Sequence, residues 1–289
     1  MIRKPIVAGQ FYEANKDALL KQIKDAFLDM RGPRELPSGQ RKGIVKGIIS
    51  PHAGYMFSGP CAAHGFKALA QSEFPNMYLM LGPSHIGFHK SCFSEDDWQT
   101  PLGLIRTNAK FCRILEENNL ELIPFPHKEE HSIEVQIPML QFASKDKESK
   151  LKFVPVMISE TDYVEAAKNL IKAVKEYEKE GKSVVVITSS DFTHFGVNYG
   201  FMPFSKNVKD NLYRLDKGAA EFMLKLDSKG FLDYCEKTGA TICGKYAIYV
   251  MIELMKAKKA RPEPLCYYTS ADIVGDYANA VGYASMVFR

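Results

Sequence analysis

Five short segments of the sequence carry residues of the types that bind metal ions or transfer protons. They are SPHAGY with His52, LGPSH with His85, HKEEHSIE with His127, His131 and Glu134, SSDFTH with Asp191 and His194, and ATICGK with Cys243. Taken singly, each histidine is more often a hydrogen-bonded structural residue than a ligand. Their repetition at the ends of apolar strands or at helix starts favours one shared site.

A metal ion is the simplest explanation for several imidazoles that converge, because unliganded histidines in a cluster would repel one another when protonated. Cys243 precedes Gly244 and an apolar helical segment, which places its thiol near a helix N-terminus, where a thiol pKa is lowered. Together with His52 and His85 it would form a soft, open-sided site for iron(II), copper or zinc. The alternative is a buried cysteine in a turn.

Asp191 and His194 are spaced so that the carboxylate could act on the imidazole. Asp191 would orient the ring of His194 or stabilise its charge, or would itself bind the metal ion. His131 and Glu134 have the same spacing.

The elements that must position these residues are strands and helices in alternation. The run VVVITS at 184–189 is apolar without alternation, which is typical of a parallel strand covered on both faces. Strands at 45–52 and 76–85, joined by a helix at 59–69, form a βαβ unit of parallel neighbouring strands. Ligands bind beyond the carboxyl ends of such strands, where His52 and His85 follow.

The rest of the chain continues this alternation. Helices are predicted at 16–30, 111–119, 133–143 with a break at Pro138, 162–180, 207–225 and 245–256, and strands at 151–159, 183–190, 264–272 and 278–288. The charged run at 145–152 is expected to be a solvated loop or helix end. The pattern predicts one α/β domain over residues 1–289, with three layers and a mostly parallel central sheet flanked by helices.

Composition narrows the possible partners and the compartment. The 38 Lys and Arg residues and 34 Asp and Glu residues are scattered without a basic block, which argues against nucleic-acid binding. No apolar run is long enough to span a membrane, and the first residues do not form a signal-peptide core. Six cysteines without a C-x-x-C pair favour reduced thiols in the cytoplasm. Structural roles are expected for His64, His89, Cys61, Cys92, Cys112, Cys235 and Cys266.

Six blocks of the sequence, in order, resemble the Memo family, also called AmmeMemoRadiSam system protein B. They are PIVAGQFY at 5–12, SPHAGYMFSGP at 50–60, LGPSH at 81–85, EEHSIEVQIP at 129–138, TSSDFTHFG at 188–196 and TICGK at 241–245. The resemblance covers nearly the whole chain, and six separated blocks are far more specific than a single short motif.

The resemblance implies a fold similar to that of class III extradiol dioxygenases, which hold iron with two histidines and a carboxylate. His52 and His85 then look like the two imidazole ligands, and Cys243 stands where a carboxylate would be. His194 resembles the acid/base histidine of that pattern, Asp191 its companion and His131 a further pocket residue. A thiolate is softer and more easily oxidised than a carboxylate, which favours copper or a redox role over ring cleavage at iron(II).

Two functions of different classes follow. The first is a metal-dependent redox enzyme that uses iron or copper, with zinc as a further possibility, on a small polar or aromatic substrate. The second is a non-catalytic adaptor whose pocket accepts a peptide side chain. The resemblance also implies association with a radical-SAM protein in microbes. Few arginines lie in the motif blocks, so phosphopeptide recognition has little support. A structural relative that keeps only the fold is a third reading.

Overall fold

The apolar run at 184–189 forms an inner strand of the sheet, β9 (Val184–Ser189), and every residue in it is buried. It pairs in parallel with β3 (Met77–Pro83) on one side and with β2 (Gly47–Ser50) on the other. The strands that precede His52 and His85 are therefore parallel, as predicted, but the prediction that they are neighbours is wrong. β9 lies between them, so Asp191 leaves the sheet between the two histidines.

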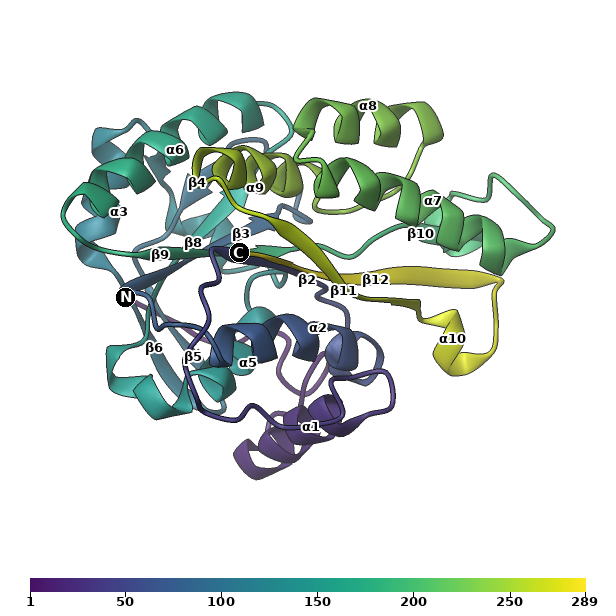
Figure 1. Cartoon of the computed structure of the whole chain (residues 1–289), viewed down its shortest axis with the longest axis horizontal. Coiled ribbons are helices and arrows are strands. Elements are labelled where there is room, and N and C mark those ends of the chain that lie inside the picture. The colour runs from purple at the N-terminus through teal and green to yellow at the C-terminus, as the bar shows by residue number, and fades with distance from the viewer.

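These strands belong to a twelve-stranded sheet in a computed structural model that describes all residues from 1 to 289 (Figure 1). The strands follow the order β1-β5-β6-β8-β3-β9-β2-β12-β10, and the five from β6 to β2 are all parallel. The other strands are β1 (Ile2–Arg3), β4 (Cys92–Phe93), β5 (Asp97–Thr100), β6 (Gly103–Thr107), β7 (Glu121–Leu122), β8 (Lys152–Ile158), β10 (His194–Gly196), β11 (Pro262–Thr269) and β12 (Asn279–Phe288).

Helices cover both faces of this sheet and complete the three layers (Figure 1). One face carries α3 (Ala109–Glu117), α6 (Tyr163–Lys179), α7 (Val208–Leu224), α8 (Ser228–Thr238) and α9 (Lys245–Ala257), and the other α1 (Lys16–Leu28), α2 (Tyr55–Ala70) and α5 (Gln136–Ala143). Short helical turns complete the chain as α4 (Pro124–His127), η1 (Lys145–Lys150), η2 (Val197–Tyr199) and α10 (Ala271–Val274). The predicted α/β class, with three layers and a mostly parallel sheet, is confirmed.

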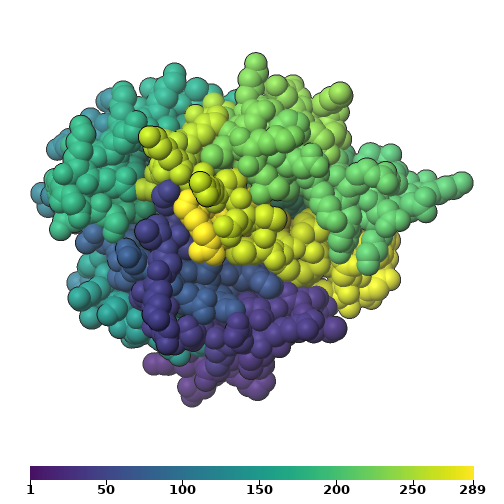
Figure 2. All heavy atoms as spheres, in the orientation of Figure 1, coloured from purple at the N-terminus to yellow at the C-terminus, as the bar shows by residue number.

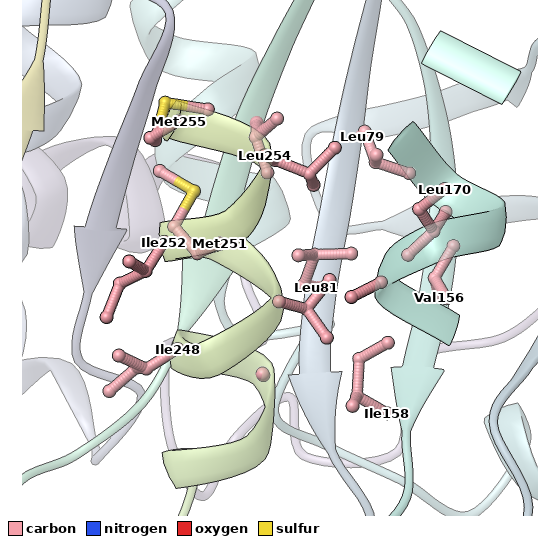
Figure 3. Close-up of a cluster of buried hydrophobic side chains, with 14 of the residues drawn as sticks. Leu79, Leu81, Val156, Ile158, Leu170, Ile248, Met251, Ile252, Leu254 and Met255 are labelled. Carbon is pink, nitrogen blue, oxygen red and sulfur yellow. The ribbon is translucent and has the colours of Figure 1, made fainter. Parts of the chain in front are cut away.

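Two apolar cores hold the layers together, one on each side of the sheet. In the larger core, α9 and α6 pack onto β3 and β8, and Ile248, Leu170 and Leu81 lie among its buried side chains (Figure 3). The C-terminal residues occupy the surface between the N-terminal third of the chain and the helices α7 to α9 (Figure 2). Helix α2 contacts both β11 and β12, so a helix from the first quarter of the chain packs on its last two strands.

Several element boundaries differ from the predicted ones for local reasons. Helix α2 begins at Tyr55, whose backbone N–H donates to the carbonyl of Phe11 at 2.7 Å, so Pro60 lies inside the helix and not at its start. Pro138 does not break α5, because it is the third residue of that helix, where an N–H would have no intrahelical partner. Helix α8 was not predicted. None of the helices combines the length and apolar character needed to cross a membrane.

Candidate metal centre

His52 lies two residues beyond β2 and is held by a hydrogen bond that fixes its tautomer. Its Nδ1 lies 2.9 Å from the hydroxyl of Ser189, at the end of β9. That hydroxyl donates its single proton to the carbonyl of Ser132 at 2.7 Å and accepts from Gln136 at 2.8 Å. It must therefore accept from His52, whose proton is on Nδ1 and whose Nε2 keeps a free lone pair.

His85 lies two residues beyond β3 and is oriented by Glu130. One carboxylate oxygen accepts from Nδ1 of His85 at 2.9 Å, and the other accepts from its backbone N–H at 2.5 Å. Gly82 permits this approach, because a Cβ there would lie 2.7 Å from the hydroxyl oxygen of Ser132. With Nδ1 committed to the carboxylate, Nε2 is the nitrogen of His85 that can bind a metal ion.

The hydrogen bond between Glu130 and His85 shifts the pKa of both groups. Burial alone raises the pKa of the Glu130 carboxyl, but the hydrogen bond and charge of His85 outweigh burial and hold this pKa at about 2. Burial lowers the pKa of His85, and the carboxylate of Glu130 more than reverses that effect, so the pKa lies above its ordinary value. His52 has no such partner, and burial holds its pKa well below the ordinary range.

Cys243 brings a sulfur atom to the free nitrogen of His52. Its Sγ lies 3.4 Å from Nε2 of His52 and accepts from the backbone N–H of Asp191 at 3.3 Å. The residue directly precedes Gly244, the N-cap of α9, as expected. The expected lowering of its thiol pKa is wrong, however, because burial and the negative charge of Asp191 raise it. A bound cation must therefore displace the thiol proton.

The three predicted ligands meet. One candidate ligand atom from each of His52, His85 and Cys243 lies within 4.8 Å of the other two. Two imidazole nitrogens and one thiolate suit zinc, copper or iron(II) and leave coordination positions open. A second group, formed by His85, Glu130 and His131, meets the same distance limit, but there the carboxylate is already engaged in orienting His85.

Asp191 and His194 lie beside this centre, but the Asp191 carboxylate does not orient the His194 ring, which was one of the predicted relations. The Asp191 carboxylate accepts from the backbone N–H groups of His52 and Ala53 at 2.8 and 3.3 Å, so it fixes the loop that carries His52. It does not hydrogen-bond to His194. The Nδ1 of His194 instead donates to the carbonyl of Thr241 at 3.1 Å, which leaves Nε2 as a proton acceptor.

His131 packs against both histidines of the centre. Its ring stacks on that of His85 at a centroid distance of 4.7 Å and lies edge-on to that of His52 at 5.6 Å. Burial lowers the pKa of His131 and outweighs the opposing charge of Glu130. A neutral ring between the candidate ligands and Phe11 can therefore contact a bound molecule without adding positive charge to the centre.

The side chains of His52, His85, His131, Asp191 and His194 line a cavity of about 530 Å³ at the carboxyl edge of the sheet, and Cys243 is not among its lining residues. Histidines and Asp191 form its floor, and aromatic residues from distant parts of the chain form much of its wall. No Lys or Arg lines the cavity. The wall includes Phe11, Phe57, Tyr199 and Tyr283.

Two residues of the candidate segments have structural roles instead. Glu134 is buried and ion-paired with Arg3 at 2.5 Å, and it also accepts from the hydroxyl of Tyr12 at 2.7 Å. His127 is buried beside Trp98, with Nε2 3.3 Å from the carbonyl of Cys92. Both residues anchor the N-terminal segment and β4 and take no part in the centre.

Three residues that shape the site were not predicted from the sequence. Glu130 and Ser189 fix the tautomers of His85 and His52, and Thr241 holds His194 through its carbonyl and its hydroxyl. Ser189 had a usable signal, because it is polar and ends a buried apolar strand. Glu130 had none, since Glu129 beside it is identical in type.

The fold and the site together define an α/β protein with a His–His–Cys cluster at the carboxyl edge of a mostly parallel sheet. Residues 3–287 match the family described as Memo-like protein. The chain is 35% identical to a MEMO1 family protein of Methanobrevibacter smithii, with full coverage of both chains. It is 34% identical to one of Nitrosopumilus maritimus, again with full coverage, and 36% identical to one of Thermotoga neapolitana, with 99% of each chain covered. The chain belongs to the Memo family.

Proposed function

We propose that this protein is a metal-binding redox protein with a dioxygenase-like pocket, which holds iron or copper at His52, His85 and Cys243. The observation that carries the proposal is the convergence of two imidazoles and one thiol within 4.8 Å. Each imidazole is oriented through Nδ1, by Ser189 or by Glu130, which is the usual arrangement of metal-binding histidines.

A bound iron or copper ion would supply one-electron chemistry and Lewis acidity at the floor of the cavity. The protein residues would handle the protons. His194 has Nδ1 tied to Thr241 and Nε2 free, so it would accept a proton from a substrate hydroxyl. The carboxylate of Asp191 would hold the loop that carries His52, and its backbone N–H would donate to the sulfur of Cys243. His131 would contact the bound substrate.

The cavity supports a small polar or aromatic substrate. Its aromatic wall can pack on a flat ring, and its polar floor can accept and release protons. The absence of Lys and Arg from the lining disfavours a substrate whose main feature is a phosphate. The reducing environment that such a centre needs agrees with six free cysteines and supports a cytoplasmic location.

Elemental analysis of anaerobically purified protein tests the metal assignment. The parent should contain iron, copper or zinc, and Cys243→Ala and His85→Ala should each lose most of it. His89→Ala and Cys235→Ala are matched controls, because His89 is exposed and Cys235 lies in the apolar core. Equal metal content in all five proteins would remove the site assignment.

Turnover is tested separately by oxygen uptake of the metal-loaded protein with catechols and other small phenols. His194→Gln should retain the metal and lose most of the rate, by about 100-fold or more for a missing acid/base group. Unchanged uptake in this variant would exclude His194 from proton transfer.

The aromatic wall of the cavity also favours a second function, an adaptor that takes up a peptide side chain. A radical-SAM protein is the partner that the family resemblance supports. The two functions separate in the metal-free Cys243→Ala variant. An adaptor would still bind its peptide tightly, whereas the redox function predicts that activity is lost with the metal.

A further inference from the structure

A second group of reactive side chains lies outside the metal centre, where α2 packs on β11. Cys61 on α2 is fully buried, and Cys266 on β11 is partly exposed. The Sγ of Cys61 lies 3.9 Å from the carbonyl oxygen of Cys266, and Cys266 packs against the apolar cluster that contains Cys61. The residues are separated by most of the sequence, so only the fold brings them together.

Helix α2 is clamped to β11 at this point. The hydroxyl of Tyr268 accepts from the backbone N–H of Cys61 at 3.2 Å and donates to the carbonyl of Phe57 at 2.6 Å. Tyr268 and Cys266 are two residues apart on the strand, so both side chains face α2. These hydrogen bonds hold α2 against β11, so Cys61 and Cys266 lie beside each other without a covalent link.

His64 and Arg31 complete the group on its outer side. Nε2 of His64 donates to the carbonyl of Arg31 at 3.0 Å, and the Sγ of Cys266 lies 3.6 Å from the same oxygen. The neighbouring Cys61 and His64 lower the pKa of the Cys266 thiol, whereas burial raises the pKa of the Cys61 thiol. The accessible cysteine is thus the more acidic and more nucleophilic one.

We propose that Cys266 and Cys61 form a dithiol site that hydrogen peroxide oxidises to a reversible disulfide, separate from the metal centre. The Cys266 thiolate attacks the peroxide, an S–O bond forms and the O–O bond breaks, and the leaving oxygen takes a proton from His64 as water. Cys61 then attacks the resulting sulfenic acid, the S–O bond breaks, and the oxygen leaves with the Cys61 proton as a second water. Two thiols lose two electrons, and one peroxide becomes two waters.

The site is placed to influence the cavity. Cys61 packs in one apolar cluster with Tyr283 and Val281, and Phe57 packs against that cluster. All three of those neighbours line the cavity beside the metal centre. A disulfide between Cys61 and Cys266 would fix α2 to β11 directly behind this wall.

Peptide mapping of the full-length protein tests the proposal. The protein is treated with hydrogen peroxide, blocked with iodoacetamide under denaturing conditions and digested with trypsin. Residues 47–67 contain Cys61 alone and residues 260–289 contain Cys266 alone, so the disulfide appears as one cross-linked pair. We expect this pair to form and to disappear on treatment with dithiothreitol. Peroxide-treated protein in which Cys266 remains alkylated and the pair is absent would overturn the proposal.

Variants distinguish the two cysteines. Cys266→Ser should abolish the pair, Cys61→Ala should leave a sulfenic acid on Cys266 that dimedone traps, and Cys235→Ser should leave the pair unchanged. Should a variant fail to fold, native alkylation of the parent still decides the matter. Cys266 should react about 10-fold faster or more than the buried Cys92, Cys112 and Cys235. Equal rates would contradict the assignment.

Discussion

At the scale of single residues, the candidate centre depends on groups that hold the imidazoles by Nδ1. Ser189 has one proton and donates it to Ser132, so it can only accept from His52. Glu130 is a carboxylate with a pKa held at about 2 by His85, so it also only accepts. Both arrangements leave Nε2 free, which is why the two rings present lone pairs to one centre.

The Glu130→Gln substitution tests this orientation. The amide keeps the size of the side chain but removes the charge that fixes the His85 proton on Nδ1, so metal affinity should fall by about 10- to 100-fold. Glu129→Gln is the matched control, because Glu129 is adjacent and exposed. Titration against a chromophoric chelator measures both. An unchanged affinity in Glu130→Gln would show that His85 needs no such partner.

At the scale of elements, the N-terminal segment is fixed to the site-bearing segment 130–134 by one buried ion pair. Arg3 and Glu134 have side chains that are 2% and 1% exposed, and Glu134 also accepts from the backbone N–H groups of Ile6 and Val7. Breaking a buried pair leaves an uncompensated charge, which costs far more than breaking an exposed pair. This anchor places Phe11 at the cavity wall.

Glu134→Gln should therefore lower the free energy of unfolding by about 3 kcal/mol or more, because Arg3 stays charged and buried. The control Asp25→Asn removes the exposed pair of Lys21 and Asp25, with side chains 78% and 59% exposed, and should cost less than about 1 kcal/mol. Urea unfolding measures both. If both substitutions lowered the free energy of unfolding equally, the ion pair of Arg3 and Glu134 would be as solvated as the exposed pair.

His127 gives the same region a pH dependence. Burial lowers its pKa to about 4 in the folded protein, against about 6.5 in the unfolded chain. As pH falls below about 6.5 the unfolded state takes up the proton first, so stability is lost until pH reaches about 4. Between pH 7 and pH 5 this group should cost about 2 kcal/mol of stability.

The His127→Gln variant removes that titration. Urea titrations at pH 7 and at pH 5 measure the free energy of unfolding of both proteins. Between these pH values the variant should lose about 2 kcal/mol less than the parent. A parent and a variant that lose equal stability would show that His127 is protonated in the folded protein.

At the scale of the whole molecule, the sheet gathers side chains that are far apart in the sequence. Because β2, β9 and β3 are parallel, the residues that follow them meet at one edge, and Cys243 arrives at the start of α9. The alternation of apolar strands and helices was enough to predict the class and this edge.

The spatial order of the strands was beyond sequence reasoning, because a parallel pair along the chain need not be adjacent in the sheet. β9 lies between β2 and β3, and its side chains are buried in the apolar cores on both faces of the sheet. The sequence also does not show which of the adjacent carboxylates, Glu129 or Glu130, approaches His85. Only the close approach of segment 130–133 to Gly82 selects which carboxylate meets His85. The thiol pKa of Cys243 depends on burial, which position ahead of a helix does not reveal.

Anomalous diffraction from crystals grown with zinc would locate the bound ion. We expect one strong peak, about 2.0 Å from Nε2 of His52 and of His85 and about 2.3 Å from Sγ of Cys243. A metal ion bound instead between His85, Glu130 and His131, with Cys243 uncoordinated, would contradict this ligand assignment.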